Sequence, residues 1–337
     1  MASGFGLPRR RSSRLLAAFP VAIVCSAATL AACSGQSGPN PSAPSSASGT
    51  NHPQITATPS STPSGPDSLN PTPSPEPSSL TPPQLPGVHW TISALSPSGS
   101  TLSAVARLDG GRVGLLWMNS DALRFRLIPG YQVPESSPVR AMDRIPATWV
   151  PQMVAAFNGG FRLKDHLGGY FYAGKTVSPL IPGVGSLMVL DDGRLQVGAW
   201  GDNMKLSSRT VAVRQELPLL VSNYQSMANN SQGADYWGRT NGSLPNANRS
   251  ALGQLSDGAL VYAEGSEVTP VQLASALIKV GVRHAMVLDM NKSWPNAFVY
   301  TRQGGQVVGQ KVQQNMWRQP SIYYQRFTKD FIVAEKR

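Results

Sequence analysis

From residue 88 onward, apolar and polar positions alternate in short runs that predict β-strands joined by tight turns. Asp-Gly pairs separate neighbouring apolar runs within residues 104–118, 186–200 and 251–265. An Asp-Gly pair between two apolar runs is a strong hairpin signal, because both residues tolerate the backbone of a primed turn. The pattern predicts a strand-rich α+β domain that has a mixed sheet and few helices.

Residues 268–281 carry the period of an amphipathic helix, with apolar side chains recurring every three to four positions. Thr269 is placed to cap the first turn, and Gln272 completes a capping box with it. Pro270 suits the first helical position, and Gly281 suits a C-terminal stop. We therefore expect one clear helix in this part of the chain.

An apolar run stands on each side of this helix, at residues 259–264 and 284–289. A strand, a helix and a strand of these lengths predict a crossover unit over residues 259–289, in which the strands are parallel and the connection is right-handed. Both strands then end at the same edge of the sheet, which places Glu264 and Asp289 there. Because ligands of open sheets bind beyond the carboxyl ends of strands, this edge is the candidate site.

A third apolar run, residues 152–158, ends in Asn158 and is followed by Gly159 and Gly160. If its strand shares the same edge, Asn158 lies beside the two acidic residues, with uncovered glycine backbone next to it. The alternative is a primed hairpin turn at Asn-Gly-Gly that has no binding role. We take the Asn-Gly-Gly segment as one wall of a pocket for substrate.

The first 32 residues have the pattern of an export signal. Four Arg residues precede an apolar run of sixteen residues, from Leu15 to Leu30, which is shorter than the roughly 20 residues that span a bilayer. The sequence LAAC at residues 30–33 resembles the lipobox of bacterial lipoproteins, in which Cys33 becomes the lipidated N-terminus. Ordinary cleavage near Ala32 is the alternative. We expect an exported protein, lipid-anchored to the outer face of the bacterial cell membrane.

Residues 33–87 comprise the lipidated cysteine and a linker. Residues 34–87 contain fourteen Pro with abundant Ser and Thr and almost no large apolar side chain. Such a segment buries too little surface to offset the entropy of ordering, so we expect a disordered stalk that holds a domain clear of the bilayer. The remaining residues, 88–337, are enough for one sizeable domain.

The charge balance favours anionic partners. The formal net charge of the chain is +11, and it falls to +7 without residues 1–32, which contain four Arg and no acid. A basic protein outside a membrane favours phosphate-bearing envelope glycans and lipid headgroups. Nucleic acid is not an expected partner, because no pattern of interleaved basic and aromatic residues is present. Cys25 lies in the removed segment, which leaves Cys33 without a disulfide partner.

The order of motifs in the second half of the chain resembles the phosphodiester glycosidase family. The similarity covers roughly residues 150–295 and rests on an ordered set of segments: AAFNGGF, GGYFYAGK, VAVRQELPLLV, RSALG, DGALVYAEG, the capped helix and AMVLD. The family implies hydrolysis of the bond between the anomeric carbon of a sugar and a phosphodiester oxygen. That chemistry needs carboxylates near an oxocarbenium-like centre and donors for the departing phosphate.

The resemblance implies roles for particular residues. Asp289 matches the Asp of the family's LDGGGSS signature and is the candidate catalytic carboxylate, together with Glu264. Arg249, in RSALG, suits the grip on phosphate, because a guanidinium binds two phosphate oxygens at once. The chain departs from the family where it reads LDMNKSW (288–294), so the close backbone approach of a glycine run is lost. Asn291 in this segment is a candidate for binding sugar hydroxyls.

Each of these residues also has a structural interpretation. Asp289 suits a cap for the segment that follows it, and Glu264 suits the electrostatics of a helix N-terminus. Arg249 is also compatible with an ordinary surface position or ion pair, and Asn291 with a residue that stabilises a turn.

Aromatic and metal-binding features add less. Trp237, in a loop rich in Asn, Gly and Ser, is the candidate platform for stacking on a sugar face, although most aromatic residues of such a domain fill the core. The four His residues have no paired spacing, so no metal site of the usual soft ligands is predicted. The sequence requires no cofactor, although an oxygen-ligated divalent cation at Asn158, Asp289 and Asn291 is conceivable.

The sequence leaves two functions open. The first is a cell-envelope hydrolase that cleaves sugar-1-phosphodiester linkages in envelope glycans. The second is a non-catalytic glycan or phosphoglycan-binding envelope lipoprotein that keeps the fold and has lost the glycine-rich turn.

Overall fold

The structure is a computed structural model that describes residues 80–337, except residues 133–141, 164, 166–167, 203, 234 and 240–243. The expected signal segment, Cys33 and most of the expected linker lie outside the described residues. The last part of that linker packs on the domain. Leu80 and Leu85 contact the core, and the indole nitrogen of Trp90 donates a hydrogen bond of 3.0 Å to Pro83 O. The folded part of the chain therefore begins before residue 88.

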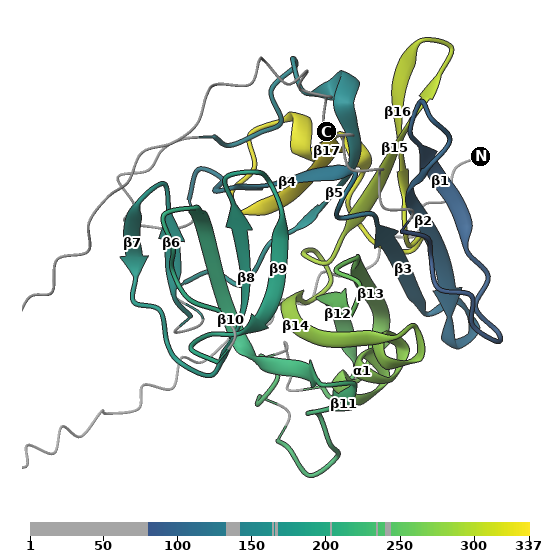
Figure 1. Cartoon of the computed structure of the whole chain (residues 1–337). Coiled ribbons are helices and arrows are strands. Elements are labelled where there is room, and N and C mark those ends of the chain that lie inside the picture. The colour runs from purple at the N-terminus through teal and green to yellow at the C-terminus, as the bar shows by residue number, and fades with distance from the viewer. Residues whose placement is uncertain are drawn as a thin grey trace, which may run out of the picture. The chain divides into compact units, whose positions relative to one another are not determined.

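The domain is built on two sheets (Figure 1). The main path of the larger sheet runs through β1 (Thr91–Leu95), β2 (Thr101–Leu108), β3 (Val113–Met118), β13 (Leu260–Val268), β12 (Ala247–Leu255), β14 (Val282–Met290), β10 (Thr210–Ser222), β6 (Tyr170–Tyr172) and β7 (Lys175–Ser178). Three further strands join it: β8 (Val184–Leu190) and β11 (Gln225–Ser226) pair with β10, and β9 (Leu195–Ala199) pairs with β8.

The smaller sheet has the order β16 (Gln306–Lys311), β15 (Ala297–Gln303), β5 (Met153–Asn158), β17 (Phe331–Lys336) and β4 (Leu123–Ile128). Short 3-10 helices interrupt the loops at η1 (Asp109–Gly111), η2 (Val150–Gln152) and η3 (Pro320–Tyr324). The single α-helix of the described residues is α1 (Pro270–Lys279). The expectation of a strand-rich α+β domain with few helices is confirmed.

The three predicted hairpins form where the Asp-Gly pairs stand. They are β2–β3, β8–β9 and β12–β13, and all three are antiparallel. The helix also begins as expected, because the Thr269 hydroxyl accepts a hydrogen bond from the Gln272 N–H and the Gln272 side chain accepts one from the Thr269 N–H. Gly281 follows the helix with φ of 82°, in the left-handed region that glycine favours.

The crossover from β13 through α1 to β14 has a feature that the sequence pattern did not show. Both strands pair antiparallel with β12, which lies between them. β13 and β14 therefore run in the same direction but are not hydrogen-bonded to each other. Every pair of neighbouring strands that the structure describes in the two sheets is antiparallel. The expected mixed sheet is therefore an antiparallel sheet that contains the predicted strand–helix–strand crossover.

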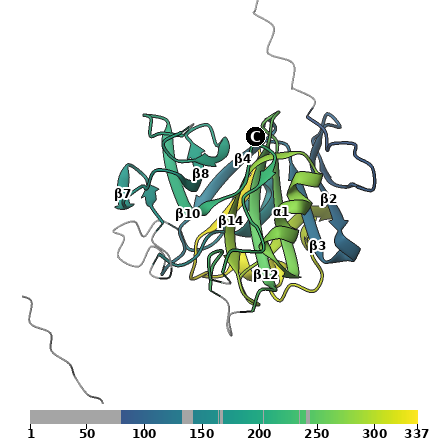
Figure 2. The ribbon, with the colours of Figure 1, turned by 90° about the horizontal axis from the view of Figure 1, so that it is seen from below.

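The central strands of the larger sheet, such as β3, β13 and β14, are buried on both faces, which explains their near-continuous apolar sequences. In β14, Ala285 and Val287 pack in the cluster that contains α1, whereas Met286 and Leu288 pack in the cluster shared with the smaller sheet. Figure 2 shows α1 lying along β12 and β14. Each large apolar side chain buried in this way contributes roughly 1.5 to 3 kcal/mol. The two sheets therefore face each other across one apolar core, and α1 covers the outside of the larger one.

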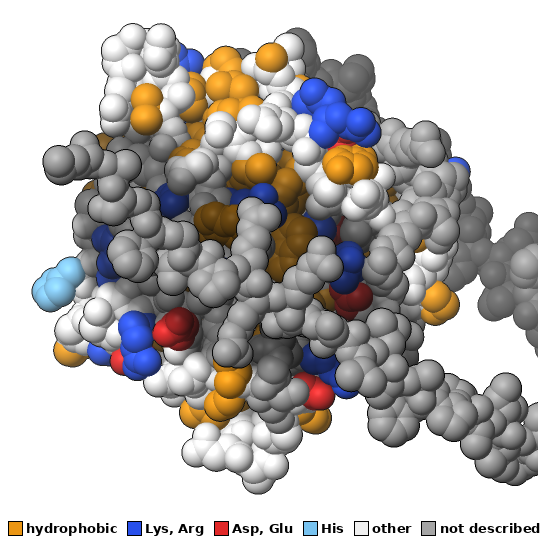
Figure 3. Space-filling view, turned by 180° about the vertical axis from the view of Figure 1, so that it is seen from behind, with side chains coloured by type: hydrophobic (Ala, Val, Ile, Leu, Met, Phe, Trp, Pro, Cys, Tyr) orange, Lys and Arg blue, Asp and Glu red, His pale blue; other side chains and the backbone are white. Residues whose placement is uncertain are grey.

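The surface shows the basic character of the chain. On the face in Figure 3, Lys and Arg side chains are more widespread than acidic ones. Within the described ranges, no helix has the length and apolar character needed to cross a bilayer.

Candidate active site

A set of buried hydrogen bonds joins the two sheets at Asn158, the last residue of β5. Its Oδ1 accepts hydrogen bonds from the Tyr262 hydroxyl on β13 (2.7 Å) and from the Asn296 N–H (3.1 Å). Its Nδ2 donates to Ser250 Oγ on β12 (2.9 Å) and to Gly159 O (2.8 Å). Asn158 is 3% exposed, and both ends of its amide are occupied. The side chain therefore connects the sheets, and this arrangement does not support its predicted contact with substrate.

Ser250 carries this connection to β14. Its Oγ accepts a hydrogen bond from the Asp289 N–H (3.2 Å) and donates one to Asp289 O (3.1 Å). A β-bulge lies at this point, because Leu288 and Asp289 both stand opposite the single residue Ser250. Bulges re-aim side chains and are frequent beside active sites. Along the rest of β14, side chains alternate between two apolar clusters. The bulge interrupts this alternation at Asp289.

The three polar residues predicted to converge are thus linked, but not at one sheet edge. Asn158 comes from the smaller sheet, whereas Glu264 and Asp289 come from the larger one. Glu264 does not end its strand either, because β13 continues to Val268. The residues meet where the end of β5 packs against β12, β13 and β14, so the contact between sheets brings them together.

Asp289 has a buried carboxylate that pairs with a lysine from the other end of the chain. Its Oδ1 accepts a hydrogen bond from the Met290 N–H (2.7 Å), and its Oδ2 forms an ion pair with Lys329 Nζ, which precedes β17. Burial raises the pKa of Asp289 to about 6, and the charge of Lys329 opposes that rise. A carboxyl group that changes charge near neutral pH is suited to a role in catalysis.

Lys329 connects this carboxylate to an aromatic ring nearer the surface. Its Nζ lies 4.5 Å from the ring centroid of Trp294, which is half-buried. A cation held over an aromatic face is stabilised by the ring quadrupole. Asp289, Lys329 and Trp294 therefore form a continuous set of contacts from the interior toward solvent.

The bare backbone of the Asn-Gly-Gly segment binds carboxylates of the chain itself. The Gly160 N–H donates to Asp330 Oδ1 (3.2 Å), and the Phe161 N–H donates to Glu216 Oε2 (3.2 Å). A Cβ atom at Gly160 would collide with the Glu216 carboxylate, and one at Gly159 would collide with Asp330. Glycine is needed here for close approach. The segment is not a hairpin turn, because β5 and the following β6 lie in different sheets.

Arg214 on β10 holds these two carboxylates together. Its Nε donates to Asp330 Oδ2 (2.9 Å), and its Nη2 lies 3.0 Å from Glu216 Oε1. Nη1 and Nη2 also donate to Gln215 O and Phe161 O. Burial lowers the pKa of Arg214, but the charges of Glu216 and Asp330 outweigh burial and raise it above the usual value. Burial raises the pKa of Glu216 well above the ordinary range, against the opposing charge of Arg214.

Glu264 is fully buried next to the sheet joint, the hydrogen-bonded set of Tyr262, Asn158 and Ser250 that connects the two sheets. Its Oε2 lies 3.3 Å from the Tyr262 hydroxyl, whose shorter contact is with Asn158 Oδ1. Burial raises the pKa of Glu264 to about 8, so the carboxyl group is mostly protonated at neutral pH. The hydroxyl has one proton. When it donates that proton to Asn158, the contact with Glu264 is made by the carboxyl proton.

Two residues that were predicted to bind substrate have structural positions. Trp237 is 3% exposed, packs in the core cluster of α1 and donates to Gln232 Oε1 (2.5 Å), so the prediction of an exposed stacking platform is wrong. Arg249 is 2% exposed. Its guanidinium donates to the carbonyl oxygens of Val268 (3.2 Å), Trp237 (3.0 Å) and Pro245 (3.3 Å). All three nitrogens are used within the chain, and burial lowers the pKa of Arg249 to about 10, so this geometry does not support a grip on phosphate.

Asn291 holds the turn that replaces the expected glycine run. Its φ is 76°, in the left-handed region that Asn adopts more readily than most residues. Its N–H donates to Asn248 O (2.9 Å). The preceding Met290 is fully buried. The turn therefore has one left-handed residue, Asn291, and the buried side chain of Met290 precedes it.

The described residues contain no cluster of the usual metal-binding side chains. Within them, no group of three or more His, Cys, Asp or Glu side chains is arranged to hold a metal ion. Asn158 Oδ1 and both Asp289 oxygens accept hydrogen bonds from the protein. An oxygen-ligated cation at these residues would have to displace those donors.

Several site residues were not predicted, although two signals in the sequence point to them. Arg214 and Glu216 stand two positions apart in β10, between two apolar runs, which puts both side chains on one face of the strand. Lys329 and Asp330 form a charged pair directly before the apolar run of β17. Ser250 gave no signal, because its role depends on the bulge opposite it.

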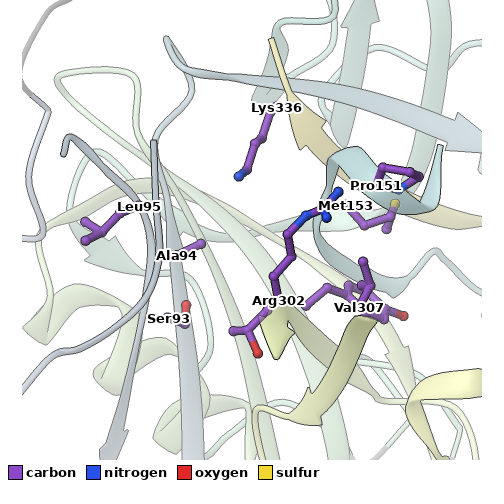
Figure 4. Close-up of a pocket in the computed structure, with 10 residues that line it drawn as sticks. Ser93, Ala94, Leu95, Pro151, Met153, Arg302, Val307 and Lys336 are labelled. Atoms are coloured by element: carbon purple, nitrogen blue, oxygen red, sulfur yellow. The ribbon is translucent and has the colours of Figure 1, made fainter. Parts of the chain in front are cut away.

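A separate cavity of about 220 Å³ lies at the end of the smaller sheet that is farther from Asn158. Figure 4 shows Arg302 of β15 and Lys336 of β17 among its lining side chains, beside Met153. Met153 begins β5 whereas Asn158 ends it, and at about 3.3 Å per residue the two ends are roughly 17 Å apart. The cavity is therefore distinct from the surroundings of Asp289.

Comparison with known families identifies the segment that contains Asn158, Glu264 and Asp289. The family model described as phosphodiester glycosidase matches residues 151–293. These residues are similar to the phosphodiester glycosidase family. The match extends from the start of β5 to just beyond β14, so this phosphodiester glycosidase segment contains the sheet joint, the Asn-Gly-Gly backbone and the bulge at Asp289. Lys329 and Asp330 come from outside it.

Two solved structures share similarity with the chain. The catalytic domain of zebrafish N-acetylglucosamine-1-phosphodiester alpha-N-acetylglucosaminidase is 16% identical, with a TM-score of 0.43 over 74% of this chain and 81% of the zebrafish chain. A hypothetical protein from Synechocystis is 14% identical, with a TM-score of 0.40 over 70% of this chain and 61% of that protein. No curated protein sequence matches the chain significantly.

The raised pKa of Glu264 predicts a particular dependence of stability on pH. In the folded chain the Glu264 carboxyl group has a pKa of about 8, whereas its ordinary pKa is 4.5. Folding therefore holds a proton on this group between these two pH values. This contribution to stability is fully present below about pH 4.5 and is lost as the pH rises toward 8. In Glu264→Gln, which stays neutral, the melting temperature should fall less over this range than in the unchanged chain. A calorimetric series over pH measures this; parallel curves for the two proteins would contradict it.

Proposed function

We propose that this protein is a cell-envelope hydrolase that cleaves sugar-1-phosphodiester linkages in envelope glycans. The observation that carries the proposal is the buried Asp289–Lys329 pair in a domain similar to the phosphodiester glycosidase family. The reaction breaks the bond between the anomeric carbon and the phosphate oxygen. Water adds its oxygen to the carbon and releases a proton, and a phosphate monoester departs.

Asp289 and Lys329 divide the charge stabilisation in this proposal. The reacting sugar develops positive charge at the anomeric carbon, which the Asp289 carboxylate stabilises. The departing phosphate gains negative charge, which the Lys329 ammonium stabilises. A phosphate monoester is a weak base, so its departure depends more on charge stabilisation than on a strong proton donor. Glu264 acts as a positioning residue, because it reaches Asp289 only through Tyr262, Asn158 and Ser250.

The cellular setting is part of the proposal. The Arg-rich, apolar leader and the LAAC sequence support export and lipid anchoring at Cys33, with the Pro-rich linker as a spacer. The net positive charge supports binding of anionic, phosphate-containing envelope glycans. The proposed protein thus acts on the outer face of a bacterial cell membrane on polymers within reach of the linker.

One observation favours a second function, a glycan-binding lipoprotein without catalysis. Both oxygens of Asp289 already accept protein donors, Lys329 and the Met290 N–H. A substrate that does not displace Lys329 would bind beside a neutralised carboxylate and remain intact. The tests below separate the two functions.

Asp289→Asn tests the proposed hydrolysis. The full chain should release reducing sugar from a panel of sugar-1-phosphodiesters, including nucleotide sugars. Asp289→Asn should lower kcat/KM at least about a hundredfold, because the variant loses the negative charge that stabilises the developing positive centre. The measurement is release of reducing sugar, with the melting temperature of the variant taken alongside.

Arg302→Gln, at the distant cavity, is the control variant and should keep the rate of the unchanged chain. Retention of the substrates without any release by the unchanged chain would contradict hydrolysis and support the binding function. Equal rates for Asp289→Asn and the unchanged chain would remove Asp289 from the mechanism.

The pH dependence of the reaction tests the ion pair. The rate should rise with pH through the pKa of Asp289, about 6, because the carboxylate form is the active one. Lys329 opposes the rise of that pKa, so Lys329→Met should move this rising limb to higher pH and also lower the maximal rate. Profiles of kcat/KM against pH measure both effects. A limb that stays in place, or moves to lower pH, would show that Asp289 is not the titrating group.

Lipid anchoring at Cys33 is tested by Cys33→Ser. The unchanged protein should fractionate with membranes and incorporate labelled fatty acid, whereas Cys33→Ser should do neither. Cys25→Ser is the matched control and should behave as the unchanged protein does. Membrane fractionation of Cys33→Ser with no labelling of either protein would refute anchoring at this residue.

A further inference from the structure

An aromatic and cationic cluster lies beside the Asp289–Lys329 pair. The Arg318 guanidinium carbon lies 5.5 Å from the ring centroid of Trp294 and 5.6 Å from that of Trp317. Lys329 Nζ lies 4.5 Å from the Trp294 centroid and pairs with Asp289. Contacts therefore run without a break from Trp317 at the surface to the buried carboxylate.

Trp317 has the exposure expected of a binding residue. At 62% it is the most exposed of the large hydrophobic side chains that the structure describes. An indole ring offers a flat apolar face, and such faces stack on the apolar faces of sugar rings. The core position of Trp237 rules it out as this platform, whereas Trp317 has an open surface.

The loop that carries Trp317 is held in place on both sides. The preceding Met316 is buried, and its carbonyl oxygen accepts a hydrogen bond of 2.8 Å from Lys311 Nζ. On the other side, Arg318 Nε donates to Ser293 O (3.0 Å), which ties this loop to the one that follows β14. Groups held in one geometry before binding lose less entropy when a ligand arrives.

Arg318 is equipped to bind phosphate. Within the described part of the chain no carboxylate pairs with it, and its hydrogen bond to Ser293 O uses only Nε. The two terminal nitrogens remain for a ligand. A guanidinium binds two oxygens of a phosphate group at once, and stacking against tryptophan holds its plane in a fixed direction.

We propose that Trp317 and Arg318, supported by Trp294, form a subsite for a second sugar–phosphate unit of the substrate. Trp317 stacks on the sugar ring of the second unit, and Arg318 binds a second phosphate, which joins that unit to a hydroxyl of the unit at Asp289. The phosphate that departs at Asp289 stays with Lys329. The substrate is then a glycan of several phosphodiester-linked units. This inference rests on the proposed function for the reaction at Asp289. The three residues lie outside the matched residues 151–293, so the family match does not account for this subsite.

The test compares two probes that differ only in length: the methyl phosphodiester of one hexosamine and an oligomer of hexosamine units joined through phosphodiesters. Binding to the full chain is measured by calorimetric titration, independently of hydrolysis. Trp317→Ala should weaken binding of the oligomer roughly fivefold through loss of stacking, and Arg318→Gln should weaken it by a similar or larger factor. Neither change should alter binding of the single unit. Trp317→Phe, which retains a ring, should recover most of the affinity.

Two control variants and the rate measurements separate the outcomes. Tyr224→Ala removes an exposed aromatic side chain outside the cluster, and Arg302→Gln removes a cation at the distant cavity; both should leave oligomer binding unchanged. Equal weakening by Arg302→Gln would show general charge attraction and overturn the subsite. Unchanged oligomer affinity in Trp317→Ala and Arg318→Gln would also overturn it, even where single units are hydrolysed. Binding of the oligomer that depends on Trp317 without sugar release would support the subsite and refute only the hydrolysis.

Discussion

The hydrogen-bonded joint of Tyr262, Asn158 and Ser250 is the constraint on which the rest of the structure depends. It crosses the apolar core between the two sheets, where an unpaired polar group would cost roughly 1 to 3 kcal/mol. Each group in it has a partner: Asn158 uses both ends of its amide, and Ser250 both accepts and donates. A polar set that is satisfied only in one arrangement fixes the sheets relative to each other. The position of Asp289 follows from it, because Ser250 binds both backbone groups of that residue.

More charged side chains are buried around this joint than the stability of the fold requires. Four acidic residues, Glu216, Glu264, Asp289 and Asp330, are buried here, and the buried cations Arg214 and Lys329 form ion pairs with three of them. Burial of charge is costly even when the charges are paired. The chain lowers this cost by protonation of Glu264, whose pKa is raised to about 8, and by the two ion pairs of Arg214. Clusters of perturbed carboxyl groups are typical of functional sites, which agrees with the role proposed for Asp289.

The family segment and the remainder of the chain contribute different parts of the site. The phosphodiester glycosidase match ends at residue 293 and supplies Asp289 with its bulge. The cation that neutralises Asp289 comes from Lys329, and the aromatic cluster beside it comes from loops near residues 294 and 317. Where the family is expected to have a glycine run, this chain has a buried Met290 and a left-handed Asn291. Asp289 stands directly before this turn.

Local patterns in the sequence were sufficient for the hairpins, the capped helix and the crossover, because Asp-Gly turns and the Thr269–Gln272 cap depend on neighbouring residues only. They also placed Asn158 and Asp289 at the ends of apolar runs, where polar side chains stand out. Partners far apart in the chain were decided by tertiary structure alone. The pairing of Asp289 with Lys329, and of Arg214 with Asp330, joins residues 40 and 116 positions apart, and no local pattern encodes such contacts. Burial likewise separated Trp237, which fills the core, from Trp317, which faces solvent, because the environment of a ring depends on how the elements pack around it.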